Sequence, residues 1–318
     1  MNRLNRRWLY LTLFTISSAV CFALPATSPS NSDGDKDAEQ LVRLTVANEI
    51  SACSKGLTKV MFLSRKHSSQ DFETKLNVET TQATAGLLIE KNNHPISDEE
   101  MQEESARLDK LSANPGELRR KQHQEQEDAD HTLRIMKALP DAFLYEFDGT
   151  EPGTSSLGKT GDELVHLKFR PNPAYAPPSR VEQVLAGMQG ELLIDKQAHR
   201  IARIDAALFK DVTFGWGILG HLDKGGTFLV EQAEVAPDDW ELTRTRLNFT
   251  GKVMMVKSLV IKSDETDCDF RTVPSNTTFA KGVELLKAEG ARLQKPDAQA
   301  QAQRREEPTR TAANQGSR

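Results

Sequence analysis

The residues of this chain that could do chemistry are its histidines, its cysteines and one glycine-rich loop. The histidines show no His-Glu-x-x-His or His-x-His spacing, which a zinc site would favour. The sequence also contains no Gly-x-Ser-x-Gly elbow for a serine nucleophile. We therefore expect a protein that is not an enzyme, with no catalytic residue, no metal ligand and no cofactor. The histidines are His67, His94, His123, His131, His166, His199 and His221.

Residues 153–160 match the Gly-x4-Gly-Lys-Thr pattern of a nucleotide-binding loop. Such a loop requires a strand before it and a helix directly after it. Here Gly161 and Asp162 follow, and an apolar segment with strand character begins at Leu164. The context predicts an ordinary Gly/Ser loop. His221 beside Asp223, in a glycine-rich turn, is likewise typical of a surface hairpin.

Cys53 and Cys268 allow two hypotheses. In an oxidising compartment they could form a disulfide between the first helix and the last strand. By the chain-entropy model, a bridge over so long a loop would stabilise the fold by roughly 4–5 kcal/mol. The alternative is two separate buried thiols. Neither cysteine has a histidine or another cysteine close to it in the sequence, so the pattern indicates neither metal binding nor a nucleophile.

The first 23 residues have the pattern of a secretory signal peptide, with three arginines and no acid before an apolar stretch. Cleavage after Ala23 places small residues at the required positions, and cleavage after Ala26 is the alternative. The apolar stretch is short for a membrane span of about 20 residues, which disfavours an uncleaved anchor. Val20 disfavours lipid modification of Cys21. We expect export to the periplasm or the outer membrane, without a membrane span after cleavage.

The net charge indicates which class of partner to expect, and the local composition indicates where the folded domain begins and ends. Removal of residues 1–23 takes away three arginines, so the net charge falls from −5 to about −8. Nucleic-acid binding depends on clustered Lys and Arg, so we expect no nucleic-acid partner. Polar composition predicts a disordered linker at 24–37 and a disordered tail at 291–318. A single domain at 38–290 is left between them.

Hydrophobic periodicity predicts a helix at about 38–55 and a charged helical hairpin at 97–139. Ser97 and Glu100 form a capping-box pattern at its start, residues 114–116 interrupt it, and Pro140 is expected to end it. We expect the hairpin to face solvent and to pack by a narrow apolar stripe. Its functional alternative is an arm that binds a partner. A further short helix at 179–186 is expected to lie across a sheet opening.

The remaining segments read as short strands in an antiparallel meander. Glycines around Trp216 predict a bent, closely packed hairpin there. The fold class is therefore α+β, a large and strongly curved antiparallel sheet forming a half-open barrel. The expected strands are 58–65, 72–80, 85–90, 142–147, 164–169, 190–195, 200–205, 207–214, 227–235, 239–249, 251–262 and 266–273.

Two strand segments carry a family resemblance, Gly-Glu-Leu-Leu-Ile-Asp at 190–195 and Arg-Ile-Ala-Arg-Ile-Asp at 200–205. With the element order and a Trp-containing turn, they resemble the periplasmic lipoprotein carriers of the LolA-like and LolB-like superfamily. The blocks 169–173, 214–220 and 269–271 are similar to a group of secreted proteins of acidobacterial type. The resemblance covers residues 40–275. The chain departs from the carriers in its charged hairpin and in lacking a match to their ligand-holding arginine.

The resemblance implies a sheet wrapped around helices with an apolar cavity for the acyl chain of a lipid or lipoprotein. A curved sheet with one apolar face either packs solid or leaves such a pocket, and both outcomes stay open. The candidate lining residues are Tyr145, Phe147, Phe169, Leu193, Phe214, Trp216, Ile218, Leu219 and Phe228.

Three functions follow as hypotheses. The first is a non-catalytic envelope protein that binds an acyl chain. The second is an interaction protein with a filled core, which docks on an envelope protein through the 97–139 hairpin. The third is a hydrolase with an unrecognised site.

Overall fold

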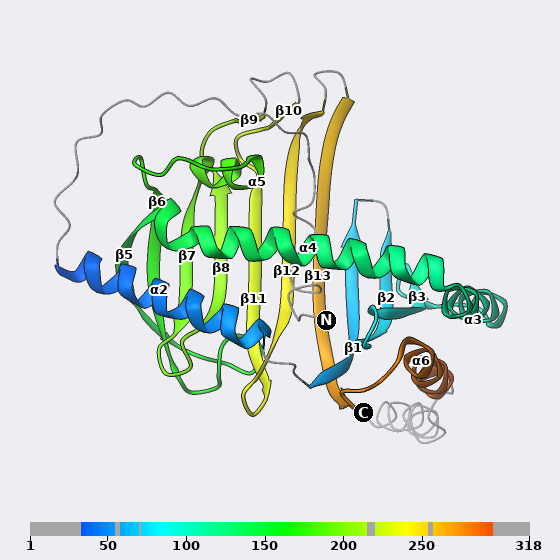
Figure 1. Cartoon of the computed structure of the whole chain (residues 1–318). Coiled ribbons are helices and arrows are strands. Elements are labelled where there is room, and N and C mark those ends of the chain that lie inside the picture. Colours follow the sequence, from blue (N-terminus) through cyan, green and yellow to red (C-terminus); the bar gives the residue numbers. More distant parts are fainter. Residues whose placement is uncertain (1–32, 55–57, 70, 215–219, 254–256, 295–318) are drawn as a thin grey trace, which may run out of the picture.

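The chain forms one large antiparallel sheet (Figure 1). The computed structural model describes residues 33–54, 58–69, 71–214, 220–253 and 257–294. The predicted signal peptide, most of the linker and nearly all of the tail lie outside these ranges. The strands are β1 (Lys59–Ser68), β2 (Phe72–Val78), β3 (Ala85–Lys91), β4 (His94–Pro95), β5 (Phe143–Pro152), β6 (Glu163–Pro171), β7 (Met188–Asp195), β8 (Arg200–Leu208), β9 (Val212–Phe214), β10 (Gly220–Leu222), β11 (Thr227–Ala236), β12 (Asp239–Val253) and β13 (Lys257–Val273).

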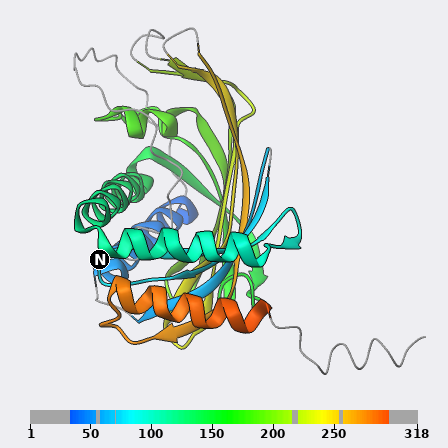
Figure 2. The ribbon, with the colours of Figure 1, turned by 90° about the vertical axis from the view of Figure 1, so that its right-hand side faces the viewer.

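The sheet runs in the order β4-β3-β2-β1-β13-β12-β11-β8-β7-β6-β5, so β4 and β5 are its two edges. The last strand in the sequence, β13, pairs with the first strand, β1. The N-terminal and C-terminal strands are therefore neighbours in the middle of the sheet. The strands β9 and β10 pair with each other, and β10 also pairs with the C-terminal end of β12. The sheet curves strongly and stays open (Figure 2), which confirms the predicted α+β class and half-open form.

Helices cover the concave side of this sheet (Figure 2). On the β5–β12 half lie α2 (Asp33–Ser54), α4 (Pro115–Ala142), the short α5 (Arg180–Gln183) and the 3₁₀ helix η1 (Val184–Gly187). On the β1–β3 half lie α3 (Asp98–Ala113) and α6 (Phe279–Gln294). Among the described helices, none has both the length and the apolar character to cross a membrane.

Local capping signals explain where α3 and α4 begin. The Ser97 hydroxyl accepts from the Glu100 backbone N–H at 3.2 Å, and the Glu100 carboxylate accepts from the Ser97 N–H at 2.8 Å. This is the predicted capping box. Asn114 separates the two helices and caps α4, since its side-chain oxygen accepts from the N–H groups of Gly116 and Glu117. Pro140 does not end α4, which continues to Ala142. Pro140 has no N–H to donate to the Met136 carbonyl, but the helix continues for two residues beyond it.

The position of α4 differs from the expected solvent-facing excursion. Buried residues form a stripe along the inner side of α4, where Ile135, Met136 and Leu139 face the sheet and Ala129 packs beside Cys53 of α2. The helix crosses the concave side from the β3 side to the β5 side (Figure 1). The apolar stripe was predicted, but its length makes α4 part of the main core and not a detachable arm.

The main core lies between α2, α4, α5 and the strands β5–β12. A second core lies between α3, α6 and β1–β3, where Phe279, Val283 and Leu286 of α6 pack on Leu76 and Leu87. The helix α6 is not among the predicted elements, although its apolar residues recur at helical spacing.

Several predicted boundaries are corrected by the structure. The helix α2 begins at Asp33, inside the predicted linker 24–37, and α6 extends to Gln294, inside the predicted tail. The predicted strand 207–214 is split between β8 and β9.

The three strands expected in 239–273 are only two, β12 and β13. Gly251 lies inside β12 and does not begin a new strand, contrary to the prediction. A Cβ atom there would come within 2.0 Å of the His221 carbonyl oxygen in β10, so the glycine allows close strand approach. The polar residues around Ser263 also stay within a strand, because β13 pairs there with both β1 and β12.

The structure does not join Cys53 and Cys268 in a disulfide. Cys53 is buried on α2 beside Ala129 of α4. Cys268 lies on β13 next to β1, where its sulfur accepts a hydrogen bond from Arg65 at 2.9 Å. Burial raises the pKa of the Cys268 thiol. The two cysteines therefore belong to separate packing environments, which favours the alternative of two separate thiols.

Candidate functional site

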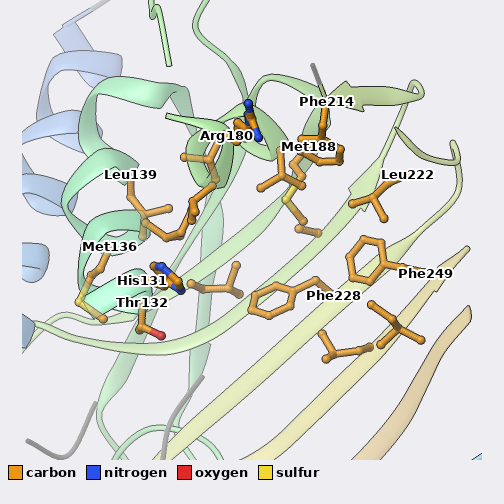
Figure 3. Close-up of a pocket in the computed structure, with 18 of the residues that line it drawn as sticks. His131, Thr132, Met136, Leu139, Arg180, Met188, Phe214, Leu222, Phe228 and Phe249 are labelled. Carbon is orange, nitrogen blue, oxygen red and sulfur yellow. The ribbon is translucent and has the colours of Figure 1, made fainter. Parts of the chain in front are cut away.

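An apolar cavity lies between the helices and the concave face of the sheet (Figure 3). Its volume is about 130 Å³. An engineered cavity of about 150 Å³ with a comparable apolar lining stays dry and binds benzene. The size therefore suits a small apolar group or one segment of a hydrocarbon chain.

The helix side of the cavity is formed by α4, α5 and η1. Ile135, Met136 and Leu139 on α4 are all buried, and they recur at i, i+1 and i+4, which places them on one helix face. The short α5–η1 segment adds Val181 and Leu185. The predicted short helix at 179–186 thus covers part of the concave face of the sheet.

The strand side is formed by inward residues of the central strands. Phe169, Met188, Phe228 and Phe249 contribute large apolar surfaces from four different strands. Smaller side chains such as Ala206 on β8 leave the space that the cavity occupies. Period-two alternation along each strand brings these residues to one face.

Three predicted lining residues are brought together at this cavity, namely Phe169, Phe214 and Phe228. Tyr145 lies beside it in the core, with its ring 6.4 Å from that of Phe169. Its hydroxyl donates to the Leu139 carbonyl oxygen at 2.7 Å, and burial raises the pKa of Tyr145. It supports the wall without lining it.

Phe147 and Leu193 do not line the cavity. The Phe147 side chain is 56% exposed, because it sits on the edge strand β5 beyond the buried Tyr145. Leu193 packs on the opposite face of the sheet with Leu157 and Leu164, while its neighbours Leu192 and Ile194 face the main core. Trp216, Ile218 and Leu219 lie outside the described residues.

Sequence reasoning missed the helix side of the wall. Ile135, Met136 and Leu139 form a clear apolar stripe, but the charged composition around them was read as a solvent-facing hairpin. Arg180 carried no sequence signal, because only the packing of α5 brings it to the cavity.

Four wall residues are polar or basic: His131, Thr132, Arg180 and His221. Thr132 donates its hydroxyl to the Asp128 carbonyl within α4 at 3.1 Å. His221 lies 3.0 Å from the Asp223 carboxylate, as a histidine–carboxylate pair at the rim. Two of the four therefore already have a partner close to them in the sequence.

The loop at 153–160 does not form a phosphate site. Gly158 donates its N–H to the Gln232 carbonyl and accepts from the Glu234 N–H, so the loop is tied to β11. The Lys159 ammonium lies 3.1 Å from the Glu234 carboxylate. The segment that follows is β6, which confirms the interpretation as a loop between strands.

A second, polar depression of about 490 Å³ lies between α3, α4 and β1–β3. Its basic side chains each pair with an acid: Lys75 with Glu73, Arg107 with Glu104, and Lys121 with Glu125. Because these charges are neutralised locally, the apolar cavity is the better candidate. Within the described ranges, no three His, Cys, Asp or Glu side chains are grouped as metal ligands.

Neither a protein-family model nor a curated protein matches this sequence. A crystal structure of a DUF1329 family protein from Desulfovibrio piger is similar to the fold, with a TM-score of 0.25 and 10% sequence identity. The similarity covers 76% of this chain and 94% of that protein. At this TM-score it carries no argument about function.

Proposed function

We propose that this chain is a non-catalytic protein of the cell envelope that binds an acyl chain of a lipid or lipoprotein. The observation that carries the proposal is the apolar cavity between α4, α5 and the sheet, whose wall combines residues from two helices and the central strands. A pocket of this kind, mostly apolar with a few polar groups, is the common form of a small-ligand site.

The volume of the cavity limits which ligands can fit. At about 130 Å³, it accommodates one chain segment and not the several chains of a complete lipoprotein anchor. A longer chain exceeds this volume, so we propose that part of the wall moves when such a chain binds. We therefore propose that a single hydrocarbon chain is held at a time.

The proposed location is the periplasm or the outer membrane. It is supported by the arginine-then-apolar pattern of the first 23 residues, which is typical of a signal peptide. The alternative of a docking arm at 97–139 loses support, because the inner face of α4 is buried in the main core and lines the cavity.

Native mass spectrometry of the protein purified from a periplasmic extract tests the proposal. We expect a bound species heavier than the bare chain, and recovery of an acyl lipid by organic extraction. The variant Ala206→Leu adds three carbon atoms at the wall and should lower the bound fraction, while Leu44→Ala on the exposed face of α2 should not. A wild-type chain that carries only a stoichiometric protein partner, without lipid, would contradict the proposal.

A further inference from the structure

The wall of the apolar cavity carries basic side chains and no acidic ones. His131 on α4, Arg180 on α5 and His221 on β10 contribute to the lining, whereas no Asp or Glu among the described residues does. A hydrocarbon ligand alone gives no reason for this asymmetry. It is the pattern expected of a site whose ligand carries a negative charge.

Arg180 is the strongest of these groups. Its Nη1 atom is enclosed and has no hydrogen-bond acceptor, and its guanidinium forms no ion pair within the described ranges. Glu182, the acid nearest to it on the same helix, accepts a hydrogen bond from the Ser179 hydroxyl. An enclosed guanidinium nitrogen without an acceptor is costly, so a bound anion would stabilise it.

His131, on the neighbouring helix α4, is the second basic side chain on the helix side of the cavity. Its Nδ1 atom is enclosed and without a hydrogen-bond partner, and α4 packs against α5. Figure 3 shows His131 and Arg180 on the helix side of the cavity, opposite Phe228 and Phe249 on the strand side. His221 differs, because Asp223 already accompanies it at 3.0 Å.

We infer that the ligand is a single-chain amphiphile with a free carboxylate, a fatty acid, and that its head group binds Arg180. The carboxylate accepts hydrogen bonds from the guanidinium on the helix side, and the hydrocarbon lies over Phe228 and Phe249. This inference rests on the proposed function. It separates a fatty acid from a lipoprotein acyl chain, whose ester or amide linkage has no negative charge.

The test compares one chain with and without its charge. The purified, delipidated protein is titrated with cis-parinaric acid and with methyl cis-parinarate, whose fluorescence rises in an apolar site. A charge-assisted hydrogen bond contributes about 1.5–3 kcal/mol. We therefore expect the acid to bind at least about 10-fold more tightly than its methyl ester.

Substitutions of Arg180 test whether this residue causes the preference for the acid over the ester. Arg180→Gln should reduce the difference between acid and ester to about twofold or less, and Arg180→Lys should keep part of it. Arg134→Gln, on the exposed face of α4, should leave the preference unchanged. Circular dichroism checks that each variant is folded.

The possible outcomes separate the two proposals. If acid and ester bind equally to the wild type, or if Arg180→Gln keeps the full preference, the fatty-acid inference is wrong and the acyl-binding proposal stands. If neither probe binds any folded variant, the acyl-binding proposal itself fails.

Discussion

The Arg200 guanidinium on β8 forms two hydrogen bonds with the Glu49 carboxylate on α2, at 2.9 and 3.1 Å, inside the protein. Both side chains are buried, and Glu49 also accepts from the Ile201 backbone N–H at 2.9 Å. The Arg200 guanidinium in turn lies over the Trp240 ring, 5.3 Å from its centre. The pair links α2 to the central sheet at a defined position.

Removal of one partner from this pair should destabilise the fold strongly. We expect Arg200→Ala to lower the free energy of unfolding by about 3–5 kcal/mol, because it leaves the Glu49 charge buried without its counter-ion. Arg43→Ala removes two ion pairs at the surface, with Glu39 and Asp141, and should cost about 1 kcal/mol or less. Urea unfolding of both variants measures the difference. Equal losses would show that the buried pair does not anchor α2.

Glu125 should give a stability contribution that decreases as pH rises. Burial raises the pKa of Glu125, even though Lys121 and the Thr84 N–H oppose this shift. The folded state therefore holds its proton to higher pH than the unfolded chain. Stability is greatest below the unfolded pKa of about 4.3 and falls as pH rises towards the folded value. Glu125→Gln should remove this dependence.

Urea unfolding of Glu125→Gln and wild type between pH 4 and pH 7 measures the effect. The variant should gain stability relative to the wild type as pH increases. Glu103→Gln on the exposed side of α3 serves as the control and should show no such trend. A Glu125→Gln variant whose stability relative to wild type does not change with pH would contradict the burial argument.

Glu289 should give a stability contribution that increases as pH rises, the opposite of the Glu125 contribution. Hydrogen bonds from Arg292 and Arg271 lower the pKa of Glu289 to about 2. The folded state therefore releases this proton more readily than the unfolded chain. The contribution is present above about pH 4.5 and is lost as pH falls towards about 2.

Because both arginines are partly exposed, we expect Glu289→Gln to cost on the order of 1 kcal/mol at pH 7 and much less near pH 2. Glu284→Gln, which removes an exposed pair with Lys281, is the matched control. Chemical denaturation at both pH values provides the measurement. An equal loss of stability at pH 7 and near pH 2 would show that the ion pairs of Glu289 do not stabilise the fold.

Substitution of two alanines of β8 tests whether the cavity has room for additional side-chain atoms. Ala206 lines the cavity, whereas Ala202 is fully buried in a cluster with Leu157, Leu164 and Leu193. Ala206→Leu should change stability by less than about 1 kcal/mol, because the cavity receives the added atoms. Ala202→Leu should destabilise by about 1–3 kcal/mol through overpacking. Thermal unfolding of the ligand-free variants distinguishes them, and equal destabilisation would indicate a filled core at Ala206.

Local sequence signals predicted the elements that depend on local physics. The capping box of Ser97 and Glu100, the alternation along β12 and the turn glycines act within a few residues, so their outcome can be read from the chain. The same holds for the antiparallel class, since short strands joined in succession pair with their neighbours. Phe169, Phe214 and Phe228 were identified because large apolar residues in strands favour the core.

Other features depend on contacts between distant segments. Leu193 and Leu192 are equally apolar, and only the register of β7 decides which of them faces the helices. Gly251 looked like a turn residue until the approach of β10 showed why no side chain fits there. Phe147 is exposed because β5 happens to be an edge strand, which is a property of the assembled sheet.

The sequence by itself determined most of the elements and the apolar character of the sheet's inner face, and it carries the pattern that predicts export. Only the tertiary structure decided that α4 belongs to the main core, that a cavity lies beneath it and that Arg180 reaches that cavity. The physical reason is that periodicity reports which face of an element is apolar, whereas the partner of that face is chosen by packing across the whole chain.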